Sequence, residues 1–214
     1  HKIEPYFQYL YDVPVVPGTY YSTQNVEAEW FFNDSLVNKG TGRNYGIDLT
    51  LEKFLSDGFY YLVTLSVFDS RYVGGEGVLR NTRFNKHYVM NLLAGKEWAV
   101  GKAKRNLLSL NGRFVVTGGD RTIPVDIAAS DIAQELVYDY SRAFEEKKPD
   151  NHILSFSINY RINKSKHSSF WSFHVVNALM EKENEGYRYN KITRKTELQK
   201  DAFFVPYLNY MLEF

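Results

Sequence analysis

Apolar and polar residues alternate along most of this chain, and the alternating runs are long. The clearest run has Leu154, Phe156, Ile158, Tyr160 and Ile162 at every second position, with Ser155, Ser157, Asn159 and Arg161 between them. A period of two is typical of β-strands with one apolar and one polar face. Runs of this kind predict eight strands, at about residues 2–11, 36–55, 59–70, 84–100, 104–118, 151–162, 169–179 and 204–214.

Short and long connections alternate between these predicted strands. The short ones are residues 56–58, 101–104 and 163–168, and the long polar ones are 12–35, 69–83, 118–151 and 180–204. In transmembrane β-barrels, short turns lie at the periplasmic rim and long loops lie outside the cell. Several predicted strands exceed the ~3–10 residues usual in soluble sheets, whereas a tilted membrane strand needs ~9–11. We therefore expect an all-β, antiparallel transmembrane β-barrel segment of about eight long strands.

Aromatic residues are abundant and several of them fall close to the short turns. The chain has 17 Tyr and 15 Phe, residues that favour strands. Trp98 precedes one short turn, Phe59 and Tyr61 follow another, and Trp171 follows a third. Amphipathic rings prefer the membrane–water interface, so the group predicts an aromatic girdle. The alternative is that each ring is an ordinary core aromatic.

Composition removes several classes of function. The net charge of +1 gives no basic field for nucleic acid, and the absence of Cys excludes disulfides, zinc–thiolate sites and cysteine nucleophiles. No stretch of about 18 apolar residues predicts a transmembrane helix. The chain begins with His1, so we expect a fragment or a processed product, and the lack of a signal peptide does not argue for the cytoplasm.

Several segments together resemble TonB-dependent outer-membrane receptors. In residues 40–52, a Gly-rich approach leads into Tyr45-Gly46-Ile47-Asp48-Leu49, which resembles a late-barrel motif of that family. Residues 58–66 and 69–72 look like its next strand, and residues 81–85 and 93–98 look like the Bacteroidetes versions. Residues 170–178 resemble the penultimate strand, although the family usually has Leu-Asp where this chain has Phe173-His174, and residues 206–214 resemble the closing strand.

The resemblance implies that residues 1–214 are the C-terminal portion of a plugged barrel of about 22 strands. The plug domain and the earlier strands would then lie outside this sequence. It further implies a cell outer-membrane location in a Gram-negative bacterium and energy-coupled uptake of a nutrient. The partners would be outer-membrane lipid, the TonB complex through the missing N-terminal part, the barrel assembly machinery and an unidentified nutrient.

Five charged residues are candidates for lining the barrel lumen: Arg43, Asp48, Glu52, Arg113 and Arg161. The arginines can line a substrate path, or they can pair with Asp48, Glu52 or Glu97 to satisfy a polar interior. We expect the polar face, with Ser157 and Asn159, to point into the lumen and the apolar face, with Ile158, to point outward. A loop cluster can stack on a sugar, grip a peptide or pack on other loops: Tyr20, Tyr21, Trp30, Phe31 and Phe32.

No catalytic, cofactor or metal site is expected. None of the five His has a metal-ligand spacing, and neither a nucleophile elbow nor a phosphate-binding loop is present. Ser172 and His174 share a polar face, but no third orienting group is indicated, so we do not predict an enzyme.

The last strand carries a predicted assembly signal. Tyr210, Leu212 and Phe214 are apolar at alternate positions and end on the final residue, which resembles the signal read by the barrel assembly machinery. Two other interpretations stay open. One is a complete eight-stranded outer-membrane barrel for adhesion or lipid modification, and the other is a soluble, carbohydrate-binding β-sandwich.

Overall fold

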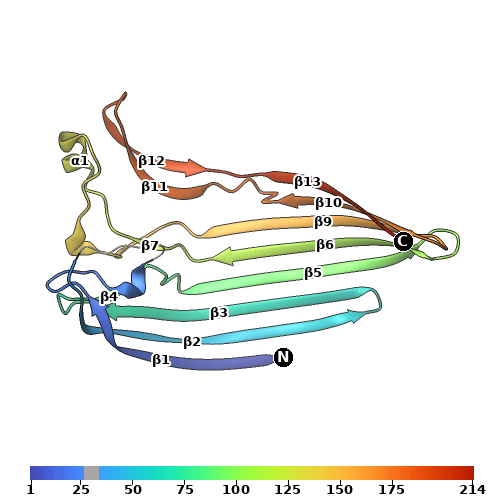
Figure 1. The fold of residues 1–214 in the computed structure, drawn as a ribbon, viewed down its shortest axis with the longest axis horizontal. Coiled ribbons are helices and arrows are strands. Elements are labelled where there is room, and N and C mark those ends of the chain that lie inside the picture. The colour runs from blue at the N-terminus through green and yellow to red at the C-terminus, as the bar shows by residue number, and fades with distance from the viewer. Residues whose placement is uncertain (27–33) are drawn as a thin grey trace.

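A computed structural model describes residues 1–26 and 34–214, and its main feature is one nine-stranded sheet (Figure 1). The strands along the sheet are β1 (Lys2–Val15), β2 (Val37–Ser56), β3 (Phe59–Val73), β5 (Tyr88–Val100), β6 (Asn106–Thr117), β9 (Asn151–Asn163), β10 (Ser168–Val176) and β13 (Val205–Glu213). The short β4 (Leu79–Asn81) pairs with β3 beside this path. Every pairing in the sheet is antiparallel, so the prediction of long antiparallel strands is confirmed.

The alternation of short and long connections is also confirmed. Tight turns join β2 to β3, β5 to β6 and β9 to β10, and the long connections gather at the opposite end of the sheet (Figure 1). The first turn is formed by Asp57 and Gly58, both with positive φ angles of 53° and 72°. An Asp-Gly pair suits such a turn because its twist matches that of the flanking strands. We call the two ends of the sheet the turn end and the loop end.

Two strands extend further than the sequence pattern indicated. β1 continues past Asp12, which has a positive φ of 54° and lies in a register shift between Leu10 and Val13. An Asp tolerates this left-handed conformation, so it forms a bulge where a strand end was expected. β3 continues to Val73, and β4 pairs with its last three residues, so part of the predicted loop at 69–83 belongs to the sheet.

The long connections contain structure of their own. They hold the pair β7 (Arg121–Thr122) and β8 (Glu146–Lys147), the hairpin β11 (Glu183–Asn190) and β12 (Lys195–Asp201), the helix α1 (Ile127–Ala133), and the 3-10 helices η1 (Thr23–Asn25) and η2 (Tyr140–Arg142). Helix α1 begins where the Asp126 side chain accepts a hydrogen bond from the Ala129 N–H. Asp131 on α1 in turn accepts from the Thr196 hydroxyl at 2.8 Å, which ties the hairpin to the helix.

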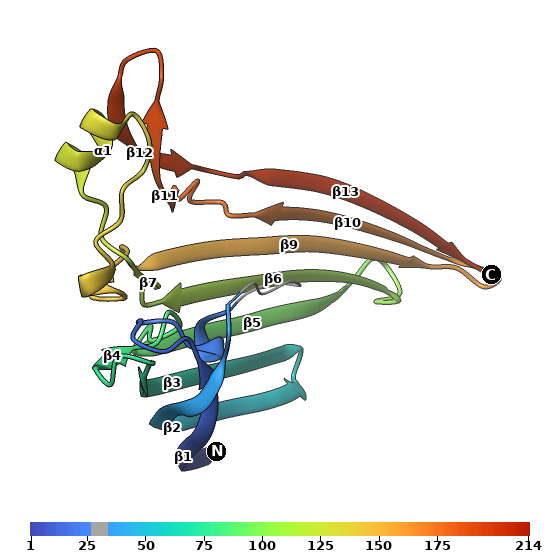
Figure 2. The ribbon, with the colours of Figure 1, turned by 60° about the vertical axis from the view of Figure 1, so that its left-hand side comes forward.

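The sheet is open in the described part of the chain. β1 pairs only with β2 and β13 pairs only with β10, so each has a free edge. The strand direction changes steadily from β1 to β13, which gives the sheet a strong twist (Figure 2). Both edge strands are exposed on both faces along most of their length.

The uninterrupted registers assign every strand residue to one of two faces. The face that we call the polar face carries Asp48, Ser66, Asn91, Asn111 and Ser157, and the apolar face carries Ile47, Leu65, Leu92, Leu110 and Ile158. The small buried hydrophobic cluster lies elsewhere, at the loop end, where Tyr72, Ala143 and Phe144 pack together. No layer covers the apolar face among the residues that the structure describes.

Candidate functional site

The polar face is joined across strands by side-chain hydrogen bonds. Ser66 on β3 donates to Asp48 on β2, and Asn91 on β5 donates to Thr64 at 3.3 Å. Both pairs connect neighbouring strands, because residues opposite each other in an antiparallel ladder lie on the same face. These bonds satisfy part of the polar groups of the face within the sheet.

A second set of hydrogen bonds, nearer the turn end, involves side chains on β3, β6, β9 and β10. The Tyr60 hydroxyl donates to Asn111 at 2.8 Å, and the Asn111 amide donates to Ser157 at 3.1 Å. On the next strands, Ser172 donates to Asn159 and lies 2.5 Å from His174 Nε2. Buried networks of this kind hold side chains in fixed positions.

Ser172 and His174 are in contact, but the Ser172 hydroxyl is buried. Ser172 is only 1% exposed, so its hydroxyl is closed to a substrate. The His174 ring stacks on Tyr207, with ring centroids 4.6 Å apart and planes 2° apart. A nucleophile needs a base and access to the reacting atom, and the access is missing here.

The structure separates the five predicted lumen-lining residues. Asp48, Glu52, Arg113 and Arg161 lie on the polar face, as the registers of β2, β6 and β9 require. The prediction for Arg43 is wrong, because Arg43 lies on the apolar face opposite Tyr9 and Arg71. Arg43 is an odd number of residues from Asp48, and no bulge lies between them to change the face.

The predicted partners of the arginines are not the ones observed. Arg161 forms an ion pair with Glu213 on β13, and it also donates to Asn163 at 3.3 Å. Arg113 is exposed and donates to the side-chain oxygen Oδ1 of Asn91 at 3.5 Å. The Arg161 contact ties β9 to β13 across β10 at the turn end, a link that strand periodicity does not reveal.

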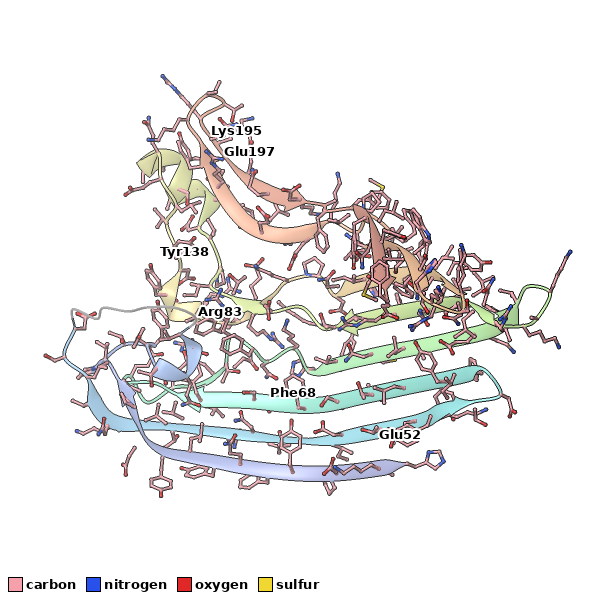
Figure 3. All side chains as sticks on the ribbon, turned by 45° about the vertical axis from the view of Figure 1, so that its right-hand side comes forward. Glu52, Phe68, Arg83, Tyr138, Lys195 and Glu197 are labelled. Carbon is pink, nitrogen blue, oxygen red and sulfur yellow. The ribbon has the colours of Figure 1, made fainter. Side chains whose placement is uncertain are left out.

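Two adjoining hollows run along the polar face. One, of about 480 Å³, is lined by Glu4, Asp48, Thr64 and Asn91, and one of about 540 Å³ is lined by Gln8, Asn44 and Ser70; both include Tyr6 and Phe68. Figure 3 places Phe68 in the middle of the sheet and Glu52 closer to the turns. Gly46 leaves room for Tyr6 there, since a Cβ on Gly46 would lie 2.8 Å from the Tyr6 hydroxyl oxygen.

The apolar face is exposed and carries a row of aromatic residues near the turns. The exposed fractions of Ile47, Leu110 and Ile158 are 54%, 47% and 45%. The registers align Trp98, Leu108, Tyr160, Trp171 and Tyr210 in one row across five strands. Trp171 and Tyr210 are in ring contact at 4.5 Å.

The predicted assembly signal lies at the turn end of β13. Tyr210 and Leu212 lie on the apolar face with Trp171, opposite the face of Asn209. Phe214 follows the end of β13 and is 97% exposed. Tyr210, Leu212 and Phe214 are therefore open to a partner that approaches the free edge or the apolar face.

A cavity of about 470 Å³, which we call the loop-end pocket, lies among the long connections. Its lining includes Tyr20, Asn25, Arg83, Arg121, Tyr138 and Phe144. Figure 3 shows Arg83 and Tyr138 at the loop end, away from the turns. The Tyr20 ring stacks on Tyr140 at 5.2 Å and meets Phe144 edge-on at 6.1 Å.

The sequence predicted only part of this pocket. Tyr20 and Tyr21 of the predicted aromatic loop cluster line it, whereas Trp30, Phe31 and Phe32 lie outside the described residues. Asn25, Arg121 and Tyr138 were not predicted, because they come from separate loops with no common spacing. The only sequence feature that could have suggested them is their residue type, because amide, guanidinium and aromatic groups in long polar connections are suited to binding a ligand.

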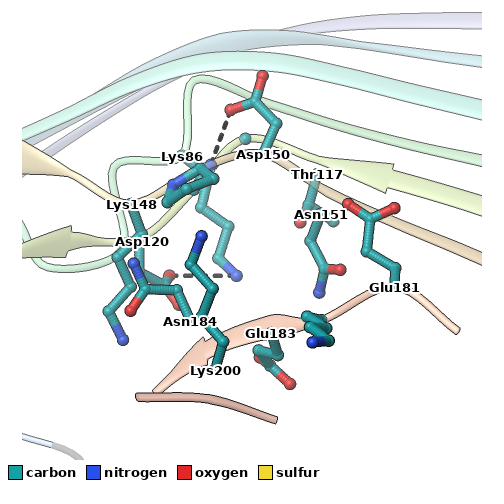
Figure 4. Close-up of a pocket in the computed structure, with 14 residues that line it drawn as sticks. Lys86, Thr117, Asp120, Lys148, Asp150, Asn151, Glu181, Glu183, Asn184 and Lys200 are labelled. Carbon is teal, nitrogen blue, oxygen red and sulfur yellow. Dashed lines mark hydrogen bonds and ion pairs between the residues drawn. The ribbon is translucent and has the colours of Figure 1, made fainter. Parts of the chain in front are cut away.

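A second loop-end cavity, of about 260 Å³, is lined by charges of both signs (Figure 4). Lys86 pairs with Asp120 at 3.1 Å, and Lys148 and Lys200 lie nearby with Glu181 and Glu183. No cluster of three potential metal ligands occurs among the residues that the structure describes. The mixed charges favour internal pairing of the loops over one defined ligand.

Asp150 is an anchor at the base of these loops. Its carboxylate accepts from Lys147 at 2.7 Å, from the Tyr88 hydroxyl at 2.6 Å and from the Gly119 N–H at 3.2 Å. Hydrogen bonds to the charged form, from Lys147 first and then from Tyr88, lower the pKa of Asp150 to about 2.

Asp150→Asn should therefore destabilise the protein at neutral pH and have little effect in strong acid. A lowered folded-state pKa contributes stability above the unfolded pKa of about 4, and this contribution is lost as the pH falls towards 2. The side chain is 35% exposed, so we expect a loss of no more than about 1 kcal/mol. The free energy of unfolding of Asp150→Asn and of the unsubstituted protein, measured at pH 7 and pH 2, checks this, with the exposed Glu135→Gln as control. If the two proteins differ in free energy of unfolding by the same amount at both pH values, the role assigned to Asp150 is contradicted.

Among the described residues, none of the helices combines the length and apolar character needed to cross a membrane. No protein-family model, curated protein or solved structure matches the chain.

Proposed function

We propose that this chain forms the C-terminal part of the barrel wall of a TonB-dependent outer-membrane receptor that takes up a nutrient. The apolar face would contact lipid, the polar face would line the lumen, and the long loops would lie outside the cell. The observation that carries the proposal is the difference between the two faces of the sheet. Membrane barrels alternate apolar-out and polar-in along every strand.

The exposure of the apolar face supports lipid as its surroundings. Leu208, Phe173 and Leu92 are 66%, 41% and 40% exposed, whereas Ser157 and Ser172 on the polar face are 8% and 1% exposed. A soluble sandwich packs its apolar face against a second sheet. A continuous exposed apolar surface usually marks contact with a membrane or a partner.

The aromatic row near the turns supports one membrane boundary. Trp98, Tyr160, Trp171 and Tyr210 share the apolar face at the turn end. Trp and Tyr prefer the interface because one end of the ring is apolar and the other can hydrogen-bond to water. The short turns would then lie on the periplasmic side.

The free edges of β1 and β13 support a larger barrel over a complete eight-stranded one. These two strands do not pair with each other in the described part of the chain. Unpaired backbone groups cost several kcal/mol each in lipid, so both edges need neighbouring strands. Together with the family-like segments, this favours the plugged receptor barrel over the adhesion or lipid-modifying barrel.

Single cysteine substitutions in the full-length protein test the orientation of the faces, and this sequence contains no Cys to interfere. Ser155→Cys should react with a charged, membrane-impermeant maleimide, and Ile158→Cys should not. A spin label attached to Ile158→Cys should instead be relaxed by oxygen, which concentrates in lipid. Both residues lie in the middle of β9, three positions apart and on opposite faces.

Equal reaction of both variants with the aqueous maleimide would overturn the membrane assignment. A label on Ile158→Cys that neither oxygen nor aqueous reagents can reach would show a protein partner on that face. For transport, ligand uptake by cells with the full-length receptor should stop when TonB is removed. TonB-independent uptake would contradict energy coupling while leaving the barrel assignment in place.

A further inference from the structure

The loop-end pocket has hydrogen-bond donors without acceptors. Only four buried side-chain polar atoms lack a partner among the described residues, and two of them, Asn25 Nδ2 and Arg121 Nε, belong to residues that line this pocket. The Asn25 Oδ1 atom is occupied, because it accepts the Arg83 N–H at 2.8 Å. That bond fixes the amide and leaves its NH₂ group for another acceptor. Buried donors without partners are uncommon and costly, so a ligand oxygen would stabilise them.

Among the described residues, no carboxylate pairs with the positive charge of Arg121 in this pocket. Arg121 donates to the Glu145 carbonyl at 3.0 Å and to the His87 ring at 2.7 Å, and neither group is a carboxylate. Lys148 adds a second cation, and Asp120 already pairs with Lys86. With both outer nitrogens engaged in these bonds, Nε is the guanidinium nitrogen left without a partner, and a guanidinium N–H bonds strongly to an anionic oxygen.

The apolar part of the loop-end pocket is formed mainly by aromatic rings that are held in place. Tyr20 and Tyr138 line the pocket with Phe144 and Ile123. Tyr20 is held by its stack on Tyr140, with ring planes 10° apart, and Tyr138 contacts the same Tyr140 ring at 6.1 Å. Fixed aromatic rings provide apolar contact area with little loss of conformational entropy. They suit the C–H face of a pyranose ring.

We propose that the loop-end pocket binds an acidic sugar, with a hexuronate carboxylate at Arg121 and its hydroxyl oxygens at the Asn25 amide. The pyranose ring contacts Tyr20 and Tyr138. The cavity of about 470 Å³ lies within the range of about 300–1,000 Å³ usual for small-ligand sites, and it accommodates one or two sugar units. The statement that an acidic sugar is the transported substrate rests on the proposed function. The statement that the pocket binds an acidic sugar does not depend on the proposed function.

Calorimetric titration of the detergent-solubilised full-length protein with digalacturonate tests the site, with neutral digalactose as the matched ligand. Digalacturonate should bind at least about tenfold more tightly, because only it brings carboxylates to Arg121. Asn25→Asp keeps the size and the Oδ1 acceptor of the side chain but replaces the free donor with negative charge. It should weaken digalacturonate binding by about tenfold or more.

Asn209→Asp is the control, because it makes the same change on an exposed residue of β13. It should leave binding unchanged. Tyr138→Leu should weaken both sugars, which a purely electrostatic site would not do. Equal affinity for the two sugars, no binding of either, or unchanged binding in Asn25→Asp would each overturn the inference. If neither sugar binds but the cysteine variants label as expected, only the sugar site is rejected. If digalacturonate binds as expected but the cysteine variants do not label as expected, only the barrel is rejected.

Discussion

Leu51→Arg in the full-length protein should reduce its amount in the outer membrane to a small fraction, whereas Glu52→Arg should leave it nearly unchanged. The two residues are adjacent in β2, but Leu51 lies on the apolar face opposite Val63, and Glu52 is exposed on the polar face opposite Leu62. An arginine facing lipid near the middle of the bilayer costs about 2–4 kcal/mol, and folded proteins are stable by only about 5–15 kcal/mol.

Immunoblots of outer-membrane fractions and denaturant unfolding in lipid vesicles measure this difference. The adjacent control receives the same side chain in the same strand, so strand propensity and expression effects are matched. Equal loss in both variants would mean that the β2 strand tolerates no large charged residue, and equal retention would mean that Leu51 does not face lipid. Either outcome would count against the proposed orientation.

Phe214→Ser should lower the outer-membrane amount of the full-length protein severalfold without changing the stability of molecules that do assemble. Phe214 is 97% exposed, so its replacement removes almost no contact within the described fold. The expected loss concerns assembly, because a partner that adds a strand recognises the backbone edge together with alternate side chains. Tyr210 and Leu212 precede Phe214 at that spacing and lie together on the apolar face of β13.

Ile192→Ser is the matched control, because Ile192 is 93% exposed and lies at the β11–β12 turn. It removes a similarly exposed apolar side chain at the opposite end of the protein. Pulse-chase labelling, followed by fractionation, separates slow assembly from degradation. Equal outer-membrane amounts of the two variants at every time would remove the role assigned to Phe214.

The strands of the sheet could be predicted because the patterns that mark a strand or a turn lie within a few neighbouring residues. A period of two shows itself within five or six residues, and Asp57-Gly58 marks a turn through its own conformational preferences. The same locality explains the errors. Asp12 looked like the end of a strand, yet it forms a bulge, and Arg43 was placed by its charge when its odd spacing from Asp48 puts it on the other face.

The sequence by itself determined the eight long strands, the two faces and the two unlike ends of the sheet, since each follows from neighbouring residues. Only the tertiary structure decided which groups meet across long separations. It paired Arg161 with Glu213, and it assembled Asn25, Arg121 and Tyr138 around one pocket. These contacts depend on the register of distant strands and on the path of the loops, and neither leaves a repeating pattern along the chain.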